Sequence, residues 1–114
     1  MAKSKLPNAL ERRHLIERDH TPAQARRYAE AYLSAGRDCD AIEFLAQAEA
    51  TEELDALRAK AIETGDAFLL RSVLRATGGT ATSQQWRSLA EAAARAGKDR
   101  YAADARPMVD RGEG

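Results

Sequence analysis

Three glycines divide the chain at similar intervals, and they constrain its fold more than any other feature. Gly36, Gly65 and Gly97 each end an alanine-rich segment. Glycine readily adopts the left-handed backbone conformation that terminates a helix. An aspartate follows each glycine within two residues and is suited to cap the next helix. These aspartates are Asp38, Asp66 and Asp99. The pattern predicts three pairs of helices, each pair joined by a short Gly-Asp turn.

Helix-start signals support this division. Thr21 and Thr82 each stand three residues before a glutamine, which is the spacing of a capping box, and Pro22 suits a first helical position. Thr51 precedes two glutamates, which favour a first helical turn. Sustained alternation of polar and apolar residues is absent, so no strand is expected. We predict helices near 8–19, 22–35, 38–49, 52–64, 66–76, 83–96 and 99–109, a loop at 77–80, and an earlier end near 106 if Pro107 shortens the last helix.

Apolar residues recur at fixed distances from the three glycines. The position eight residues before holds Tyr28, Leu57 and Leu89, and the positions four and three before hold Tyr32, Ala61, Ala93, Leu33, Ile62 and Ala94. The positions five and nine after hold Ala41, Leu70, Ala102, Leu45, Leu74 and Arg106. These offsets place one apolar stripe on each helix of a pair, so the inner faces of the two helices can meet. The predicted fold is all-α: a right-handed stack of three antiparallel helical hairpins plus an N-terminal helix.

The hairpins resemble tetratricopeptide repeats, whose pattern has Trp, Leu-Gly and Tyr in the first helix and Ala and Phe in the second. The first unit matches at Ala29, Tyr32, Gly36, Ala41, Leu45 and Ala48, and the third at Trp86, Leu89, Ala90, Ala93, Gly97 and Ala102. The second unit matches at Leu57, Ala61, Gly65, Leu70 and Leu74 but has Arg58 where a small residue is expected. The glycines lie 29 and 32 residues apart instead of the family's 34, and the closing proline is missing from every unit. Other α-solenoids and a compact helical bundle therefore stay open.

The resemblance implies a function as well as a fold. Related proteins bind peptides or partner helices on a concave surface formed by the first helix of each hairpin. Carried over by position, the partner-binding residues expected here are Arg26, Glu30, Leu33, Asp55, Ala59, Ile62, Arg87, Glu91, Ala94 and Arg95. Charged groups around small apolar residues suit an amphipathic or charged protein segment. The expected function is a protein-binding adaptor or scaffold.

A homo-oligomeric structural protein is an alternative to that function. Apolar residues near the start, Leu6, Leu10, Leu15 and Ile16, could cap the stack or dock on a second copy or a partner. Near the end, Tyr101, Met108 and Val109 could stay partly exposed or pair with another subunit.

Nucleic-acid binding is the second alternative, and the distribution of charge argues against it. The 18 basic and 18 acidic residues balance, so the protein lacks a net field that would attract phosphate. Basic residues gather near both ends, but residues 49–66 hold six acids against two bases. The central segment would therefore repel a nucleic acid.

Length and composition indicate one domain, residues 8–109, between a flexible basic start at 1–7 and a flexible tail at 110–114. The first residues are basic but lack the apolar core of a secretory signal, and no apolar run is long enough to span a membrane. A single cysteine, Cys39, excludes an internal disulfide and fits a reducing compartment. A cytoplasmic protein is expected.

Catalytic and metal-binding patterns are weak. Glu11 and His14 have the Glu-x-x-His spacing of a di-iron helix, but the only other histidine, His20, lies in no such motif. Cys39 stands between Asp38 and Asp40, whose carboxylates would raise its pKa and suppress its nucleophilicity. We expect no enzyme activity, no catalytic residue, no metal and no cofactor.

Overall fold

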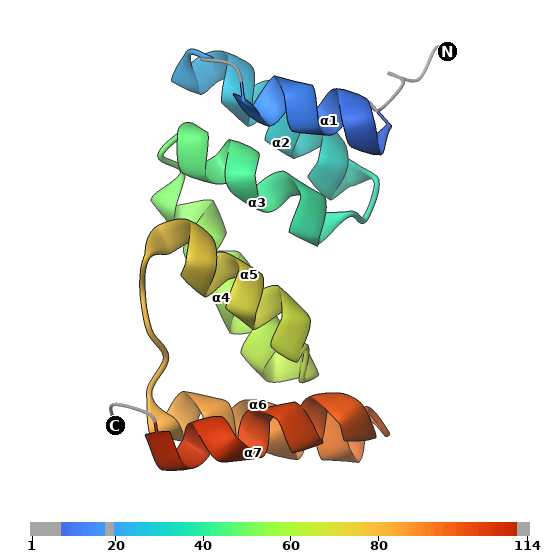
Figure 1. Cartoon of the computed structure of the whole chain (residues 1–114), viewed down its shortest axis with the longest axis vertical. Helices are drawn as coiled ribbons and strands as arrows, with labels where there is room; N and C mark the ends of the chain where they lie inside the picture. Colours follow the sequence, from blue (N-terminus) through green and yellow to red (C-terminus); the bar gives the residue numbers. More distant parts are fainter. Residues whose placement is uncertain (1–7, 18–19, 112–114) are drawn as a thin grey trace. The chain divides into compact units, whose positions relative to one another are not determined.

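The fold is all-α. The computed structural model describes residues 8–17 and 20–111, and within these residues it contains helices and no strand (Figure 1). The helices are α1 (Ala9–Glu17), α2 (Pro22–Ser34), α3 (Asp38–Gln47), α4 (Thr51–Thr64), α5 (Ala67–Thr77), α6 (Ser83–Arg95) and α7 (Asp99–Arg111). Every helix predicted from the sequence is present, with its described ends within two residues of the expected positions. The last two residues expected for the first helix, 18–19, lie outside the described part of the chain. Contacts divide the chain into two compact units, Met1–Thr51 and Glu52–Gly114, which are described in turn.

The predicted capping boxes of α2 and α6 are both confirmed. At the start of α2 the Gln24 amide N–H donates to Thr21 Oγ1 (3.2 Å), and the Thr21 N–H donates to Gln24 Oε1 (3.1 Å). Thr82 and Gln85 form the same pair of bonds before α6, at 3.0 and 2.9 Å. These reciprocal bonds satisfy amide groups that the first turn of a helix leaves without intrahelical partners.

The aspartate caps are confirmed only at Asp66, whose Oδ1 accepts from the Leu69 N–H at 3.0 Å. Asp38 was wrongly expected to be a cap: Arg37 is the N-cap of α3, without a capping side-chain bond, and Asp38 is the first helical residue. Asp99 likewise lies inside the first turn of α7. A carboxylate in the first turn still interacts favourably with the helix dipole, which explains an acidic residue at either position.

The turn glycines have the predicted backbone conformation. Gly36, Gly65 and Gly97 all have φ of +75°. The connection from α3 to α4 turns without a glycine, because Glu49 adopts a left-handed φ of 55°. The sequence predicts the break between the two helices but not the left-handed conformation of Glu49, since glutamate is not a usual residue in this conformation.

Aromatic side chains form the core of the first unit. Tyr32 of α2 stacks on Phe44 of α3, with 5.8 Å between ring centroids, and both side chains are fully buried. Tyr28 and His20 extend the cluster toward the surface, each 5.3 Å from its nearest ring neighbour. Tyr28 is therefore half-buried, although the repeat pattern predicted an inner-face position. Burial raises the pKa of the Tyr32 phenol, an effect that the nearby Arg12 and Arg37 guanidiniums partly oppose.

A polar anchor holds α1 against α2 and α3. The Arg12 guanidinium lies 5.8 Å from the ring centroids of both Tyr32 and Phe44, and its Nε and Nη2 donate to the Asp40 carbonyl at 3.1 and 2.9 Å. Leu10 is 61% exposed and contributes little to this contact. The N-terminal helix predicted from the sequence is present, and Arg12 gives it contacts with α2 and α3 that the sequence analysis did not predict. Leu6 and the side chain of Leu15 lie outside the described part of the chain.

The core of the second unit combines residues from all four of its helices. Trp86 and Leu89 of α6, Leu70 and Val73 of α5, and Leu57 of α4 are buried. Ala102 and Ala105 supply the buried face of α7. Trp86, which matches the tryptophan of the repeat pattern, is only 1% exposed.

Some positions of the predicted apolar stripes are not buried. The positions four before and five after each glycine are buried in every unit, as predicted. Leu33, Ile62 and Leu74 are only half-buried, and Ala94 and Arg106 are exposed. Their positions lie at the edge of the apolar stripe of each helix, so their side chains are only partly directed toward the core.

The last helix continues past Pro107 to Arg111, two residues beyond the predicted end at 109, so Pro107 does not shorten it to about 106. A proline inside a helix removes one amide donor, which leaves the carbonyl four residues earlier without a partner. That residue is Ala103, which is exposed, so water can satisfy its carbonyl. The Ser83 hydroxyl donates to the Val109 carbonyl at 2.5 Å and holds the last turn of α7 against the start of α6.

Candidate binding surface on α6 and α7

The predicted binding residues lie on the first helix of each hairpin, as the repeat pattern requires. Arg26, Glu30 and Leu33 lie on α2 in the first unit, where Glu30 is exposed and the other two are half-buried. They form a set of their own, separate from the residues of the second unit described next.

Seven predicted binding residues lie in the second unit. On α4, Asp55 and Ala59 are exposed and Ile62 is half-buried. On α6, all four predicted residues are exposed: Arg87, Glu91, Ala94 and Arg95. Exposure is what a binding residue requires, but it does not by itself bring these side chains together.

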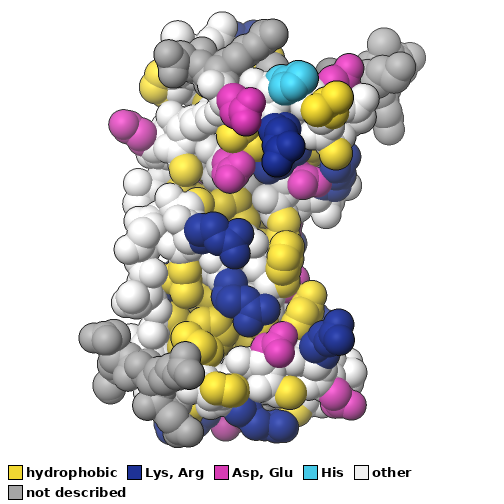
Figure 2. All heavy atoms as spheres, viewed as in Figure 1, with side chains coloured by type: hydrophobic (Ala, Val, Ile, Leu, Met, Phe, Trp, Pro, Cys, Tyr) yellow, Lys and Arg dark blue, Asp and Glu magenta, His cyan; other side chains and the backbone are white. Residues whose placement is uncertain are grey.

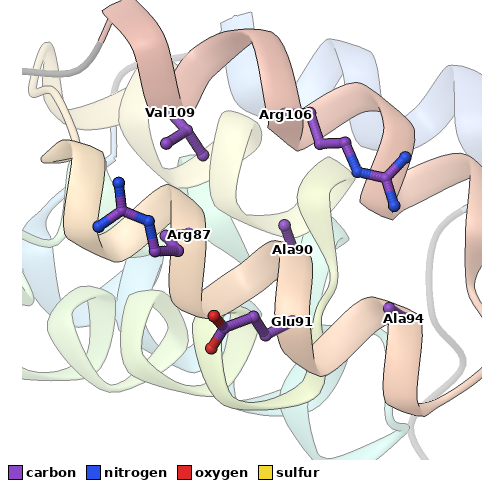
Figure 3. Close-up of a pocket in the computed structure, with 6 residues that line it drawn as sticks. All are labelled: Arg87, Ala90, Glu91, Ala94, Arg106 and Val109. Atoms are coloured by element: carbon purple, nitrogen blue, oxygen red, sulfur yellow. The ribbon is translucent and has the colours of Figure 1, made fainter.

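Three of the predicted residues, Arg87, Glu91 and Ala94, line an open depression of about 310 Å³ between α6 and α7. Its lining consists of Arg87, Ala90, Glu91, Ala94, Arg106 and Val109. Figure 3 shows the first four extending from α6 and the last two from α7. The methyl groups of Ala90 and Ala94 and the Val109 side chain make an apolar floor, with charged groups around it.

The lining residues of α6 lie on a different side of this helix from its buried residues. The buried residues of α6 are Trp86, Leu89, Ala92 and Ala93. With 3.6 residues per turn, positions 87, 90, 91 and 94 fall on another side of the same helix. The hairpin therefore keeps its core on one face and presents the depression on another.

Ala90, Arg106 and Val109 were not among the predicted binding residues. Arg106 occupies the position nine residues after a turn glycine, where the other two hairpins have Leu45 and Leu74. A charged residue at an otherwise apolar repeat position indicates that this face of the last hairpin is exposed. That break in the repeat was the sequence signal for the depression.

Charge around the depression is unbalanced. Arg87 and Arg106 contribute two guanidiniums from opposite helices, and Glu91 contributes one carboxylate. Arg87 Nη1 donates to Gln84 Oε1 at 3.1 Å, which leaves most of its donors available. No ion pair joins Glu91 to either arginine among the described side chains. The rim is thus positively charged around a small apolar floor.

Charged side chains of both signs occur on the surface of the molecule (Figure 2). On the face drawn in Figure 2, Lys and Arg side chains are interspersed with Asp, Glu and hydrophobic ones. This distribution agrees with the zero net charge of the chain. It gives little support to an extended phosphate-binding surface.

The groups considered for catalysis or metal binding remain dispersed. Residues 8–17 and 20–111 contain no group of three or more His, Cys, Asp or Glu side chains that could hold a metal ion. His14 is exposed on α1, and Cys39 is half-buried in the first turn of α3. In the same described residues, no helix combines the length and apolar character needed to cross a membrane.

Comparisons with known proteins found no matching protein-family model, curated protein or solved structure.

Proposed function

We propose that this chain is a non-enzymatic protein-binding module, an adaptor or scaffold of the tetratricopeptide-like type, that acts in the cytoplasm. The observation that carries the proposal is the depression on α6 and α7, where Arg87, Glu91 and Ala94 lie together. The resemblance to tetratricopeptide repeats also implies partner binding for these three residues.

The composition of the depression supports a protein partner. Small apolar side chains allow close approach of another backbone, and the neighbouring arginines can form charge-assisted hydrogen bonds with carboxylates. A mixture of an apolar floor and a polar rim is typical of protein–protein interfaces. The cytoplasm suits a chain with a single cysteine.

Affinity capture with a charge-and-shape variant tests the proposal. The variant Arg87→Glu with Ala94→Trp reverses one charge and fills the apolar floor. Both residues are exposed, so we expect it to remain folded by circular dichroism. A partner that binds here should be captured about tenfold more weakly, which corresponds to about 1.4 kcal/mol of binding free energy.

The matched control is Arg100→Glu with Ala56→Trp, the same two changes at exposed positions outside the depression. This control should capture the partner as the unmodified chain does. If every captured protein binds the two variants equally well, the depression is not the binding surface. The Arg26→Glu variant applies the same test to the predicted residues of α2.

A further inference from the structure

The two hairpins of the second unit differ in what covers their outer faces. When the sequence is aligned on Gly65 and Gly97, Arg58 of α4 corresponds to Ala90 of α6. Arg58 Nη2 donates to the Thr80 carbonyl and to Gln85 Oε1, both at 2.7 Å. This face of α4 therefore meets the start of the next helix, α6, whereas Ala90 lines the open depression.

The turn glycines show the same difference. A Cβ atom built on Gly65 would lie 2.3 Å from the Ala93 backbone nitrogen, so α6 packs directly on the end of α4. A Cβ atom on Gly97 would meet nothing within 4 Å. The Lys98 ammonium adds a further link, by donating to the Thr64 carbonyl at 2.8 Å. Among the residues that the structure describes, a helix therefore lies against Gly65 of the α4–α5 hairpin, and none lies at the corresponding position, Gly97, of the α6–α7 hairpin.

Side-chain size on the open face allows a helix to approach closely. Ala90 and Ala94 replace Arg58 and Ile62 of the preceding hairpin. The distance between packed helices is set by the side chains at their contact, and alanines permit the shorter end of the range. A visiting helix could therefore bring larger apolar side chains than α6 does.

The charge of the rim selects the partner. Arg87 and Arg106 flank the alanines from α6 and α7, against the single carboxylate of Glu91. Two copies of the same face would bring together four guanidiniums and only two carboxylates, and this excess of positive charge disfavours self-association. Acidic side chains beside an apolar stripe would instead pair with both guanidiniums.

We propose that the α6–α7 depression binds an acidic amphipathic helix of a partner protein, which packs on this hairpin as α6 packs on α4. This inference rests on the proposed function and specifies its partner. It gives the two arginines the role of selecting charge, and it gives Ala90 and Ala94 the role of admitting a helix.

Three labelled synthetic peptides test the chemistry of the partner. The first is a helix of about 18 residues, long enough to be helical in part in water, with glutamates beside a stripe of leucine and alanine. The second replaces each glutamate with lysine, and the third has a proline at its centre. Fluorescence anisotropy with the full chain should show binding of the first peptide. The other two peptides should bind at least about tenfold more weakly.

Charge exchange tests the site. The variant Arg87→Glu with Arg106→Glu should bind the acidic peptide about tenfold more weakly than the unmodified chain and the lysine peptide more tightly. The control Arg100→Glu should bind both peptides as the unmodified chain does. Raising the salt concentration should weaken the acidic complex. A merely structural role of the arginines would not produce the gain for the lysine peptide.

Other outcomes would overturn the inference. Equal binding of the three peptides, or no binding of any, excludes an acidic helix as the occupant. If captured partners still depend on Arg87 and Ala94, the proposed function stands with a different partner; if they do not, both fall. Light scattering that shows a dimer, lost in the Arg87→Glu with Arg106→Glu variant, would make a second copy the occupant.

Discussion

Gly65 and Gly97 illustrate how residues with the same local conformation differ in their surroundings. Both have φ of +75° at the end of a first helix. A residue with a Cβ atom is destabilised by roughly 1–2 kcal/mol in this conformation, which explains a glycine at the end of each of these helices. Only Gly65 also lies against the backbone of another helix, at Ala92 and Ala93.

Gly65→Ala should therefore destabilise the protein more than Gly97→Ala. We expect a loss of about 1–2 kcal/mol of unfolding free energy for Gly97→Ala, from backbone strain alone. For Gly65→Ala we expect about 3 kcal/mol or more, since the new methyl group collides with a backbone that cannot rotate away. Urea unfolding followed by circular dichroism measures both losses. Equal losses would show that α6 does not pack on Gly65.

Tyr32 links burial to pH. Because burial raises the pKa of its phenol in the folded protein, the unfolded chain releases this proton first as pH rises. The protonated Tyr32 phenol therefore contributes fully to the free energy of unfolding below the ordinary tyrosine pKa of about 10. This contribution is lost as pH rises above that value toward the pKa of the folded protein.

Tyr32→Phe should consequently reduce the fall in unfolding free energy above about pH 10. Urea unfolding at a series of pH values on either side of that point measures the slope. Tyr101→Phe, at a half-buried position on α7, is the matched control. A slope unchanged by Tyr32→Phe would contradict the burial of this phenol.

At the scale of the helix, sequence signals were most accurate where a side chain bonds to the backbone a few residues away. The capping boxes at Thr21 and Thr82 were predicted with their partners, because both ends of each bond lie within one turn. Asp38 and Pro107 were placed less well. A helix start can shift by one residue with little energetic change, and a proline is tolerated where water satisfies the freed carbonyl.

Thr82→Ala should weaken the start of α6. It removes the hydroxyl that accepts from the Gln85 N–H, and a lost N-cap costs about 1 kcal/mol. The effect is measured as a lower midpoint of urea unfolding. Thr80→Ala is the control: Thr80 is exposed in the same loop, and its carbonyl bond to Arg58 survives the change. Equal effects of the two changes would argue against the cap.

At the scale of the whole molecule, the predicted binding residues divide between two units. Arg26, Glu30 and Leu33 belong to Met1–Thr51, and the other seven belong to Glu52–Gly114. The right-handed stack of all three hairpins stays a prediction. Within the second unit, the tertiary structure selects a smaller set, Arg87, Glu91 and Ala94, and joins it to side chains from α7.

Local sequence signals predicted the all-α class, the approximate bounds of the helices in the described residues, the glycine turn within each hairpin and part of each hairpin's buried core. These features depend on local capping, on the left-handed preference of glycine and on helical periodicity. Three contacts became visible only in the folded chain: Arg12 anchors α1, α6 packs on Gly65, and Arg106 and Val109 line the same depression as Ala90. Such contacts join residues far apart in the chain, so they depend on how whole helices pack, which no short-range pattern specifies.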